Sequence, residues 1–207
     1  MTRLAFTLAK VFRNEDALQR FSVPRSDLAN ETEGKTVAVV GNARSLEAAD
    51  HGAAIDTADI VVRINSAPIP SERSHGGRTD WLAVSTPVSA ATLQARQPSR
   101  HLWMTPKRRR LPYAFAAADG FYLFPQEEHR RLSSEAGERP TTGLMVIDLL
   151  SRLPAARIDL YGFDFFASLS LSGARTSDQV PHDFNAERDW VHRLLARDGR
   201  FTLVRAG

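Results

Sequence analysis

Val37-Ala-Val-Val-Gly-Asn-Ala-Arg-Ser45 is the stretch that decides the fold of this chain, because it combines a buried strand, a turn and the start of a helix. Its apolar run is continuous rather than alternating, which is typical of a strand covered on both faces of a parallel sheet. Gly41 lets the backbone turn sharply or approach a ligand closely, and Asn42 offers an amide that donates and accepts hydrogen bonds. The stretch suits a phosphate-bearing ligand, although Asn42 could equally stabilise only its own turn.

Strand and helix signals alternate along the chain from residue 34 onward. Strands are expected over Thr36–Val40, Asp59–Ile64, Trp81–Val84, His101–Met104, Gly120–Phe124, Arg157–Tyr161 and Phe201–Val204. Helices are expected over Leu46–His51, with Ser45 as N-cap and Gly52 past the end, and over Thr141–Leu153 and Phe184–Arg197. This order predicts an α/β fold with a single Rossmann-like, mostly parallel sheet and helices on both faces. Ligands of such sheets bind at the carboxyl ends of the strands.

Length and composition limit how the chain is organised. With 207 residues and no internal repeat, one domain is expected over residues 34–207, preceded by an N-terminal segment, residues 1–33. In that segment apolar and basic residues alternate. They predict either a helix packed on the core, the favoured interpretation, or an amphipathic helix on a membrane surface.

The absence of cysteine excludes disulfides and thiolate metal sites, and it fits a reducing compartment. No apolar run has the length of a membrane span, and the N-terminus lacks the apolar core of a signal peptide. The sequence therefore predicts a cytoplasmic protein that at most touches the inner membrane face.

The formal net charge of +3 favours an anionic ligand or surface. The densest basic run, Lys107-Arg-Arg-Arg110, has three interpretations. A solvated loop is favoured, contact with an anionic acceptor or membrane comes second, and a nucleic-acid patch comes third.

Polar residues follow several of the expected strands. Strand alternation puts Arg63 and Asn65 on the same side of their strand. The amide of Asn65 would then join that of Asn42 at one edge of the sheet. Arg63 could instead form a salt bridge with an acid such as Asp80. Tyr161 and Gly162 end another strand at the same sheet edge.

The stretch Pro140-Thr-Thr-Gly143 opens the long apolar helix. The hydroxyls of Thr141 and Thr142, the flexible Gly143 and the N-terminal amides of the helix can all face one anion. A simple threonine N-cap without a ligand explains the same residues.

Of the six histidines, His182 is the candidate base. It precedes Asp183, a good N-cap, and Glu187 lies on the apolar stripe of the following helix and is expected to point inward. A histidine that titrates near neutral pH can take a proton from a sugar hydroxyl. The other histidines are expected in exposed or turn-like positions without a role: His51, His75, His101, His129 and His192.

Together these segments resemble the sialyltransferases of glycosyltransferase family 29. The residues from Val37–Ser45 through Arg63-Ile-Asn-Ser-Ala-Pro68 resemble the large sialylmotif of that family. Pro140–Val146 with Ile158-Asp-Leu-Tyr-Gly-Phe163 resembles the small sialylmotif, and His182-Asp-Phe-Asn-Ala-Glu187 the very small motif. The three motifs occur in the family's order and cover most of residues 36–195.

The resemblance implies an inverting transfer of sialic acid, or a related 2-keto sugar acid, from its CMP-activated donor to a glycan or lipid-linked glycan. His182 would be the general base and Glu187 would support it. Asn42 and Asn65 would contact the cytidine phosphate and ribose, and Thr142 with Gly143 would hold the nucleotide. The full substrate-binding set is Gly41, Asn42, Ser45, Arg63, Asn65, Thr141, Thr142, Gly143, Tyr161 and Gly162. Because the DxD pattern of metal-binding carboxylates is absent and Asp164 stands alone, no metal or other cofactor is expected.

Two departures from the family pattern have consequences. The usual motif cysteines are missing, which fits a bacterial, cytoplasmic relative. The histidine- and tyrosine-rich motif is not evident between Leu169 and Pro181, so Tyr161 or an arginine such as Arg175 would have to assist the departing phosphate. Two other functions therefore stay open: a catalytically inactive nucleotide-binding protein with a regulatory or assembly role, and a nucleic-acid-binding domain that uses Lys107–Arg110.

Overall fold

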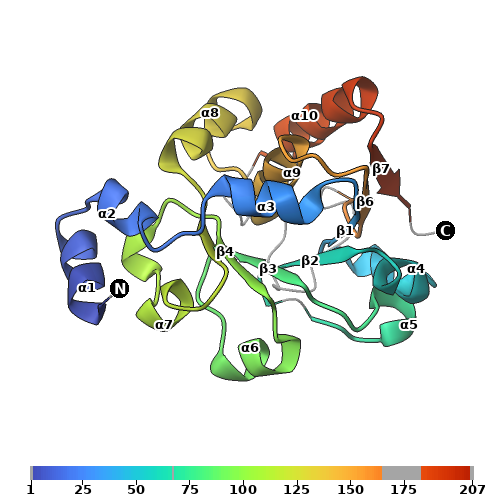
Figure 1. The fold of residues 1–207 in the computed structure, drawn as a ribbon. Coiled ribbons are helices and arrows are strands. Elements are labelled where there is room, and N and C mark those ends of the chain that lie inside the picture. Colours follow the sequence, from blue (N-terminus) through green and yellow to red (C-terminus); the bar gives the residue numbers. More distant parts are fainter. Residues whose placement is uncertain (1, 67, 165–182, 206–207) are drawn as a thin grey trace.

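The computed structural model describes residues 2–66, 68–164 and 183–205. In this part of the chain seven strands form one sheet in the order β5-β4-β3-β2-β1-β6-β7, with helices on both sides (Figure 1). All neighbouring strands are parallel. The strands are β1 (Thr36–Val40), β2 (Ile60–Ile64), β3 (Trp81–Val84), β4 (Arg100–Trp103), β5 (Phe121–Leu123), β6 (Arg157–Tyr161) and β7 (Phe201–Val204). The predicted Rossmann-like α/β fold is confirmed.

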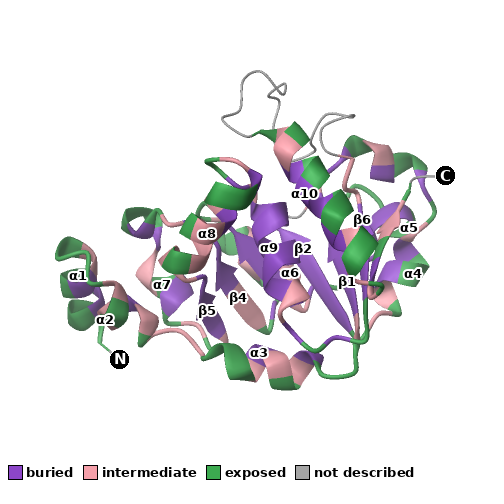
Figure 2. Ribbon diagram, turned by 90° about the horizontal axis from the view of Figure 1, so that it is seen from above, coloured by how far each residue is buried: buried purple, intermediate pink, exposed green. Residues whose placement is uncertain are grey.

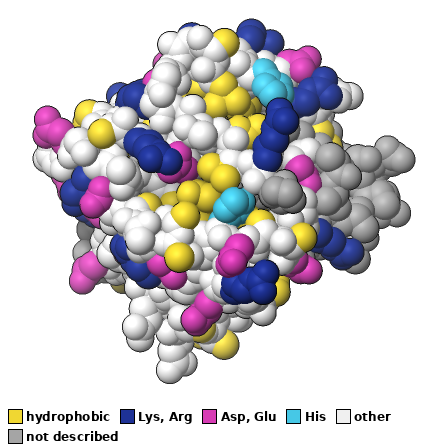
Figure 3. Space-filling model, turned by 90° about the vertical axis from the view of Figure 1, so that its right-hand side faces the viewer, with side chains coloured by type: hydrophobic (Ala, Val, Ile, Leu, Met, Phe, Trp, Pro, Cys, Tyr) yellow, Lys and Arg dark blue, Asp and Glu magenta, His cyan; other side chains and the backbone are white. Residues whose placement is uncertain are grey.

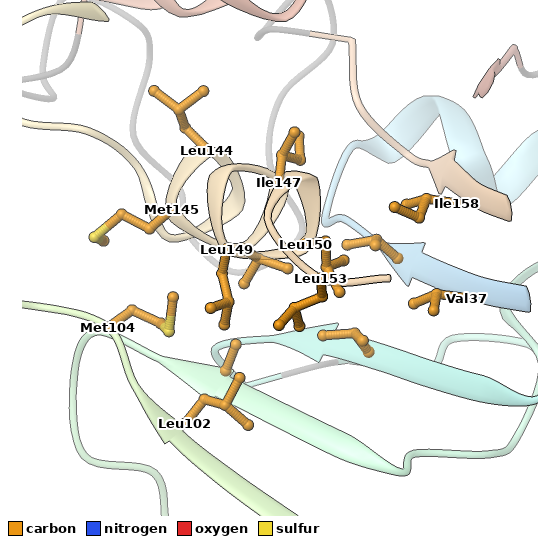
Figure 4. Close-up of a cluster of buried hydrophobic side chains, with 14 of the residues drawn as sticks. Val37, Leu102, Met104, Leu144, Met145, Ile147, Leu149, Leu150, Leu153 and Ile158 are labelled. Carbon is orange, nitrogen blue, oxygen red and sulfur yellow. The ribbon is translucent and has the colours of Figure 1, made fainter. Parts of the chain in front are cut away.

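One face of the sheet is covered by α3 (Arg25–Thr32), α8 (Gln126–Ala136), α9 (Thr142–Ser151) and α10 (Phe184–Arg197). Helix α9 lies directly over the central strands, and its residues Thr142 to Leu150 are all buried (Figure 2). Leu149 and Leu153 point from this helical segment toward the strands, where Leu102 lies opposite (Figure 4). The nearly all-round apolar sequence of α9 therefore reflects a helix enclosed between the sheet and other helices.

Asp148 is the one acid within the buried part of α9, and only 2% of it is exposed. Its carboxylate pairs with Arg131 of α8 at 2.5 Å and with Arg152 at 2.5 Å. Charge pairs therefore hold this buried acid against α8 and satisfy its carboxylate away from solvent.

The other face of the sheet has two groups of short helices. Under β3, β4 and β5 lie α1 (Arg3–Val11), α2 (Glu15–Gln19), α6 (Ala90–Arg96), the 3-10 turn η2 (Arg108–Arg110) and α7 (Tyr113–Ala116). Near β1, β2 and β6 lie the 3-10 turn η1 (Arg44–Ala48), α4 (Gly52–Asp56) and α5 (Glu72–His75). In the N-terminal segment, Phe6 and Ala9 of α1 are buried against the first group, so α1 packs on the core.

The predicted helix Leu46–His51 is wrong. The chain forms η1 and then α4, and α4 begins at Gly52, where the prediction placed the end of a helix. A Cβ atom on Gly52 would lie 1.8 Å from the carbonyl oxygen of Glu72. This glycine is therefore needed for the close approach of α4 to α5, not for a helix C-cap.

The prediction of a solvated loop for Lys107–Arg110 is wrong for Arg108. Its guanidinium is buried and donates to Glu15 at 2.6 Å and to the carbonyl oxygens of Thr105 and Phe124 at 2.7 and 2.5 Å. Lys107 and the other two arginines of the run are exposed. One arginine thus fixes the loop to α2 and β5, and the remaining charges face solvent.

The sheet topology sets the position of the ligand site. From β1 the chain continues through β2, β3, β4 and β5 on one side, and it returns to β6 and β7 on the other side of β1. The strand order reverses between β1 and β6, where Val40 pairs with Tyr161. In open α/β sheets this switch point opens a crevice at the carboxyl ends of the strands.

No helix in the part of the chain that the structure describes has both the length and the apolar character needed to cross a bilayer.

Candidate nucleotide-binding site

A cavity of about 1090 Å³ opens at the carboxyl ends of the strands, beside this switch point. Its walls come from the loops after β1, β2, β3, β4 and β6 and from the first turns of α9 and α10. Eight of the predicted site residues line it: Gly41, Asn42, Asn65, Thr141, Thr142, Gly143, Gly162 and Glu187. A volume of this size accommodates a nucleotide together with a sugar.

Close contacts between glycines form one side of this cavity. The N–H of Gly41 donates to the carbonyl oxygen of Tyr161 at 2.8 Å, and a Cβ on Gly41 would lie 2.3 Å from the carbonyl oxygen of Gly162. Gly162 has φ +67°, and a Cβ on Gly143 would lie 2.8 Å from the ring of Phe163. Glycine is required at position 41 because the backbones after β1 and β6 touch each other, and at position 143 because the start of α9 lies against the ring of Phe163.

Asn65 connects the ends of β2 and β3 with the start of α9. Its backbone has φ +57°, a left-handed conformation that asparagine tolerates better than most residues. Its Oδ1 accepts from the N–H of Ser85 at 3.2 Å and from the hydroxyl of Thr142 at 3.3 Å. The same hydroxyl lies 2.6 Å from that of Ser85, so three polar side chains form one network at the cavity wall. Asn42 lies next to it and donates to the carbonyl oxygen of Ile64 at 3.2 Å.

The N-terminus of α9 faces the cavity. Thr141 is its N-cap, and its hydroxyl accepts from the N–H of Leu144 at 3.1 Å, as the simple cap interpretation predicted. Within residues 2–66, 68–164 and 183–205, the N–H groups of Thr142 and Gly143 donate to no other group. Two N–H groups at the positive end of a ten-residue helix favour an anion at this position.

Glu187 reaches the same turn from the first turn of α10. Its side chain is 3% exposed, and its two oxygens accept from the backbone N–H and the hydroxyl of Thr141, each at 2.7 Å. Burial raises the pKa of Glu187 to about 7, although the two hydrogen bonds from Thr141 act in the opposite direction. The inward orientation predicted for Glu187 is confirmed, and its contacts connect α10 with α9.

Three predicted site residues lie away from the cavity walls. The Arg63 side chain is buried and donates to the carbonyl oxygens of Arg78 at 2.6 Å and His75 at 2.8 Å. Alternation holds only within a strand, and β2 ends at Ile64, so the left-handed Asn65 does not follow the direction of Arg63.

Tyr161 and Ser45 are the other two. The ring of Tyr161 packs in the cluster beneath β1 and β2, 5.6 Å from the ring of His51, so its side chain cannot assist a leaving phosphate in the cavity. Ser45 donates to Asp164 at 3.0 Å, and Asp164 rather than Ser45 lines the cavity. His182 and Arg175 lie outside the described residues.

The structure adds cavity residues that the sequence analysis missed. Ser85 follows β3, just as Asn42 follows β1 and Asn65 follows β2. The criterion that selects polar residues at the carboxyl ends of parallel strands would also have included the hydroxyl of Ser85. His129 of α8 also lines the cavity, contrary to the expectation of an exposed, turn-like position. Its pKa is lowered by burial and by the nearby Arg108.

The family model described as glycosyltransferase family 29 (sialyltransferase) matches residues 3–126, more than half of the chain. No curated protein matches the chain.

Among solved structures, a mammalian sialyltransferase in complex with Gal-β1-3GalNAc-ortho-nitrophenol superimposes with a TM-score of 0.63 at 20% identity. The match covers 96% of this chain and 78% of that one. The sialyltransferase CstII from Campylobacter jejuni, in complex with cytidine 5′-monophosphate, superimposes with a TM-score of 0.58 at 16% identity, covering 83% and 79%. At these identities the structural likeness shows the shared fold.

A parallel sheet with a cavity at its switch point is the arrangement in which open α/β proteins bind nucleotides. The chain belongs to glycosyltransferase family 29, the sialyltransferases.

Proposed function

We propose that this protein transfers sialic acid, or a related 2-keto sugar acid, from its CMP-activated donor to a glycan hydroxyl with inversion at the anomeric carbon. The observation that carries the proposal is the cavity at the β1–β6 switch point, where Asn42, Asn65 and the N-terminus of α9 meet. Two structural neighbours support it, since one was solved with CMP and the other with a galactose-containing disaccharide derivative.

The nucleotide phosphate is proposed to lie at the first turn of α9. The N–H groups of Thr142 and Gly143 would donate to it, and the helix dipole would favour its negative charge. The amides of Asn42 and Asn65 would contact the ribose and the phosphate, because each can donate to one group and accept from another. The network of Asn65, Ser85 and Thr142 would hold these groups in position before the substrate binds.

In the proposed reaction, the acceptor hydroxyl oxygen attacks the anomeric carbon of the sugar acid on the face opposite the phosphate. The bond between that carbon and the phosphate oxygen breaks, and its electron pair leaves with CMP. The proton of the acceptor hydroxyl passes to His182, the general base implied by the family resemblance. Negative charge that accumulates on the departing phosphate is stabilised by the N-terminus of α9.

Glu187 is proposed as a positioning residue that acts through Thr141. Its carboxylate fixes the N-cap of α9, and it belongs to the same helix turn that follows His182 in the sequence. The base and the phosphate site would therefore be connected through the first turn of α10.

The reaction is proposed to need no metal ion or other cofactor, because the helix N-terminus and the amides supply the groups that bind the phosphate. Turnover in the presence of a chelator tests this directly. Full activity with chelator is expected, and loss of activity that added Mg²⁺ restores would contradict it.

The experiment that tests the proposal is release of CMP from two donors, CMP-sialic acid and CMP-3-deoxy-octulosonic acid, followed by NMR. Wild type is expected to turn over at least one donor with inverted product configuration. His182→Ala should lose at least about a hundredfold in rate, as removal of a general base does. His192→Ala, an exposed histidine on α10, serves as the matched control and should retain wild-type activity.

Binding of CMP without turnover of either donor would contradict the proposal and would favour the inactive nucleotide-binding protein. Salt-sensitive binding to oligonucleotides that CMP does not displace would favour the nucleic-acid-binding alternative.

A further inference from the structure

We infer that helix α1 docks the protein on the surface of an anionic lipid membrane. The inference goes beyond the proposed transfer reaction and rests on an exposed apolar face of α1 and on the charges around it.

Four apolar side chains of α1 and its C-cap are exposed to solvent. Leu4 is 70% exposed, Leu8 46%, Val11 67% and Phe12 75%. Among the described residues, these four are the large hydrophobic side chains that are exposed. Their spacing of four, three and one residues puts them on one side of a helix. Burying such an apolar stripe removes area from water, so the exposed face is a candidate contact surface.

The core of the protein uses a different side of α1. Phe6 and Ala9 are buried, and the ring of Phe6 contacts the rings of Phe21 and Tyr113 at 5.3 and 5.5 Å. The structure therefore shows the packed side of this helix, and the membrane-surface interpretation of its other side stays a prediction. The core contacts hold α1 rigidly while its apolar stripe faces outward.

The location of α1 makes this stripe accessible. The helix lies at the end of the sheet formed by β5 (Figure 2), and β7 lies at the opposite end of the molecule (Figure 1). The face on the β7 side shows several separate hydrophobic areas, with acidic and basic side chains between them (Figure 3). The large hydrophobic residues that are exposed in the described part of the chain nevertheless all belong to α1 and its C-cap.

The charges on α1 itself favour an anionic surface. Between Thr2 and Asn14 the chain has three basic residues, Arg3, Lys10 and Arg13, and no acidic residue. Arg3 and Arg13 are exposed, and long basic side chains can reach a lipid headgroup while an adjacent apolar stripe enters the interface. This charge pattern complements a leaflet rich in anionic lipids.

A contact within the structure connects this helix with the cavity. The Nζ of Lys10 donates to the carbonyl oxygen of Leu111 at 2.7 Å, directly after the basic run Lys107–Arg110. Lys107 and Arg110 of that run line the cavity. The docking helix and one wall of the cavity are therefore tied to the same loop, which suits an acceptor that is presented at a membrane surface.

Vesicle flotation with the full chain tests the inference. Wild type is expected to float with vesicles of phosphatidylcholine and phosphatidylglycerol, less at high salt, and not with phosphatidylcholine alone. The double variant Val11→Ser/Phe12→Ser should weaken binding by at least about tenfold. Arg3→Gln should weaken it by about fivefold, whereas its matched control Arg193→Gln, an exposed arginine on α10, should not.

Two further measurements make each outcome decisive. Circular dichroism and CMP titration should be unchanged in Val11→Ser/Phe12→Ser, because these side chains lie outside the core and the cavity. If that variant fails to fold, Arg3→Gln and Arg193→Gln still test the inference. Failure to bind anionic vesicles, equal binding by wild type and the α1 variants, or a wild-type dimer that Val11→Ser/Phe12→Ser converts to monomer would overturn it. None of these results depends on whether the proposed transfer reaction occurs.

Discussion

The buried carboxylate of Glu187 accepts hydrogen bonds from both the backbone N–H and the hydroxyl of Thr141. The first turn of α10 thereby holds the N-cap of α9, whose next two N–H groups face the cavity. A single carboxyl group thus joins two helices at the point where the nucleotide phosphate is proposed to bind.

The first prediction concerns the pH dependence of stability. Because burial raises the pKa of Glu187 from 4.5 to about 7, the folded protein retains a proton that the unfolded chain releases. The stabilising contribution is complete below about pH 4.5 and is lost as the pH rises through about 7. The stability of wild type relative to Glu187→Gln should therefore fall by roughly 3 kcal/mol over this range.

Urea unfolding at a series of pH values measures this difference. Glu33→Gln, an exposed glutamate, is the control and should follow wild type throughout. A wild-type stability that rises relative to Glu187→Gln between pH 5 and 7 would show that the carboxylate is bound in its ionised form.

The second prediction concerns the contact between the loops after β1 and β6. Gly41→Ala places a methyl group 2.3 Å from the carbonyl oxygen of Gly162, a backbone atom that cannot rotate away. We expect a loss of about 2 kcal/mol in the free energy of unfolding and a clearly weaker affinity for CMP. Gly199→Ala meets open space and should change stability by less than about 0.5 kcal/mol. Equal effects of the two substitutions would contradict the close approach.

The third prediction separates two neighbouring arginines. Arg108→Met leaves Glu15 and the carbonyl oxygen of Phe124 without their buried donor, and it should cost about 3 kcal/mol. Arg109→Met removes an exposed charge and should stay within about 0.5 kcal/mol of wild type. Denaturant unfolding of both variants measures the difference, and similar values for the two would exclude a structural role for Arg108.

The fold was predictable because its strands are continuous apolar runs between turn residues. Four strands begin and end at their predicted residues: β1, β3, β6 and β7. The limits of the other three strands differ from the prediction by one residue at one or both ends. Helix α8 was missed because most of its sequence is polar and only Leu132 and Ala136 are buried, which gives too few apolar residues to show a period.

The site was partly predictable, since carboxyl ends of parallel strands must meet at one edge. That rule predicted Asn42 and Asn65 at one edge of the sheet, and both line the cavity. The rule could not predict the position of the Arg63 side chain. An arginine that donates to buried backbone carbonyl oxygens cannot be distinguished by sequence from an arginine that binds a ligand. The contact of Glu187 with Thr141 depends on two helices that are far apart in sequence, and no local pattern reveals it.

The most direct test of the central claim is calorimetric titration of CMP into wild type, Asn42→Ala and Asn30→Ala. Asn42 lines the cavity, whereas Asn30 is an exposed asparagine on α3. We expect wild type and Asn30→Ala to bind CMP equally and Asn42→Ala to bind it at least about tenfold more weakly. Absence of CMP binding to wild type, or equal binding by all three proteins, would contradict a nucleotide site at the β1–β6 switch point.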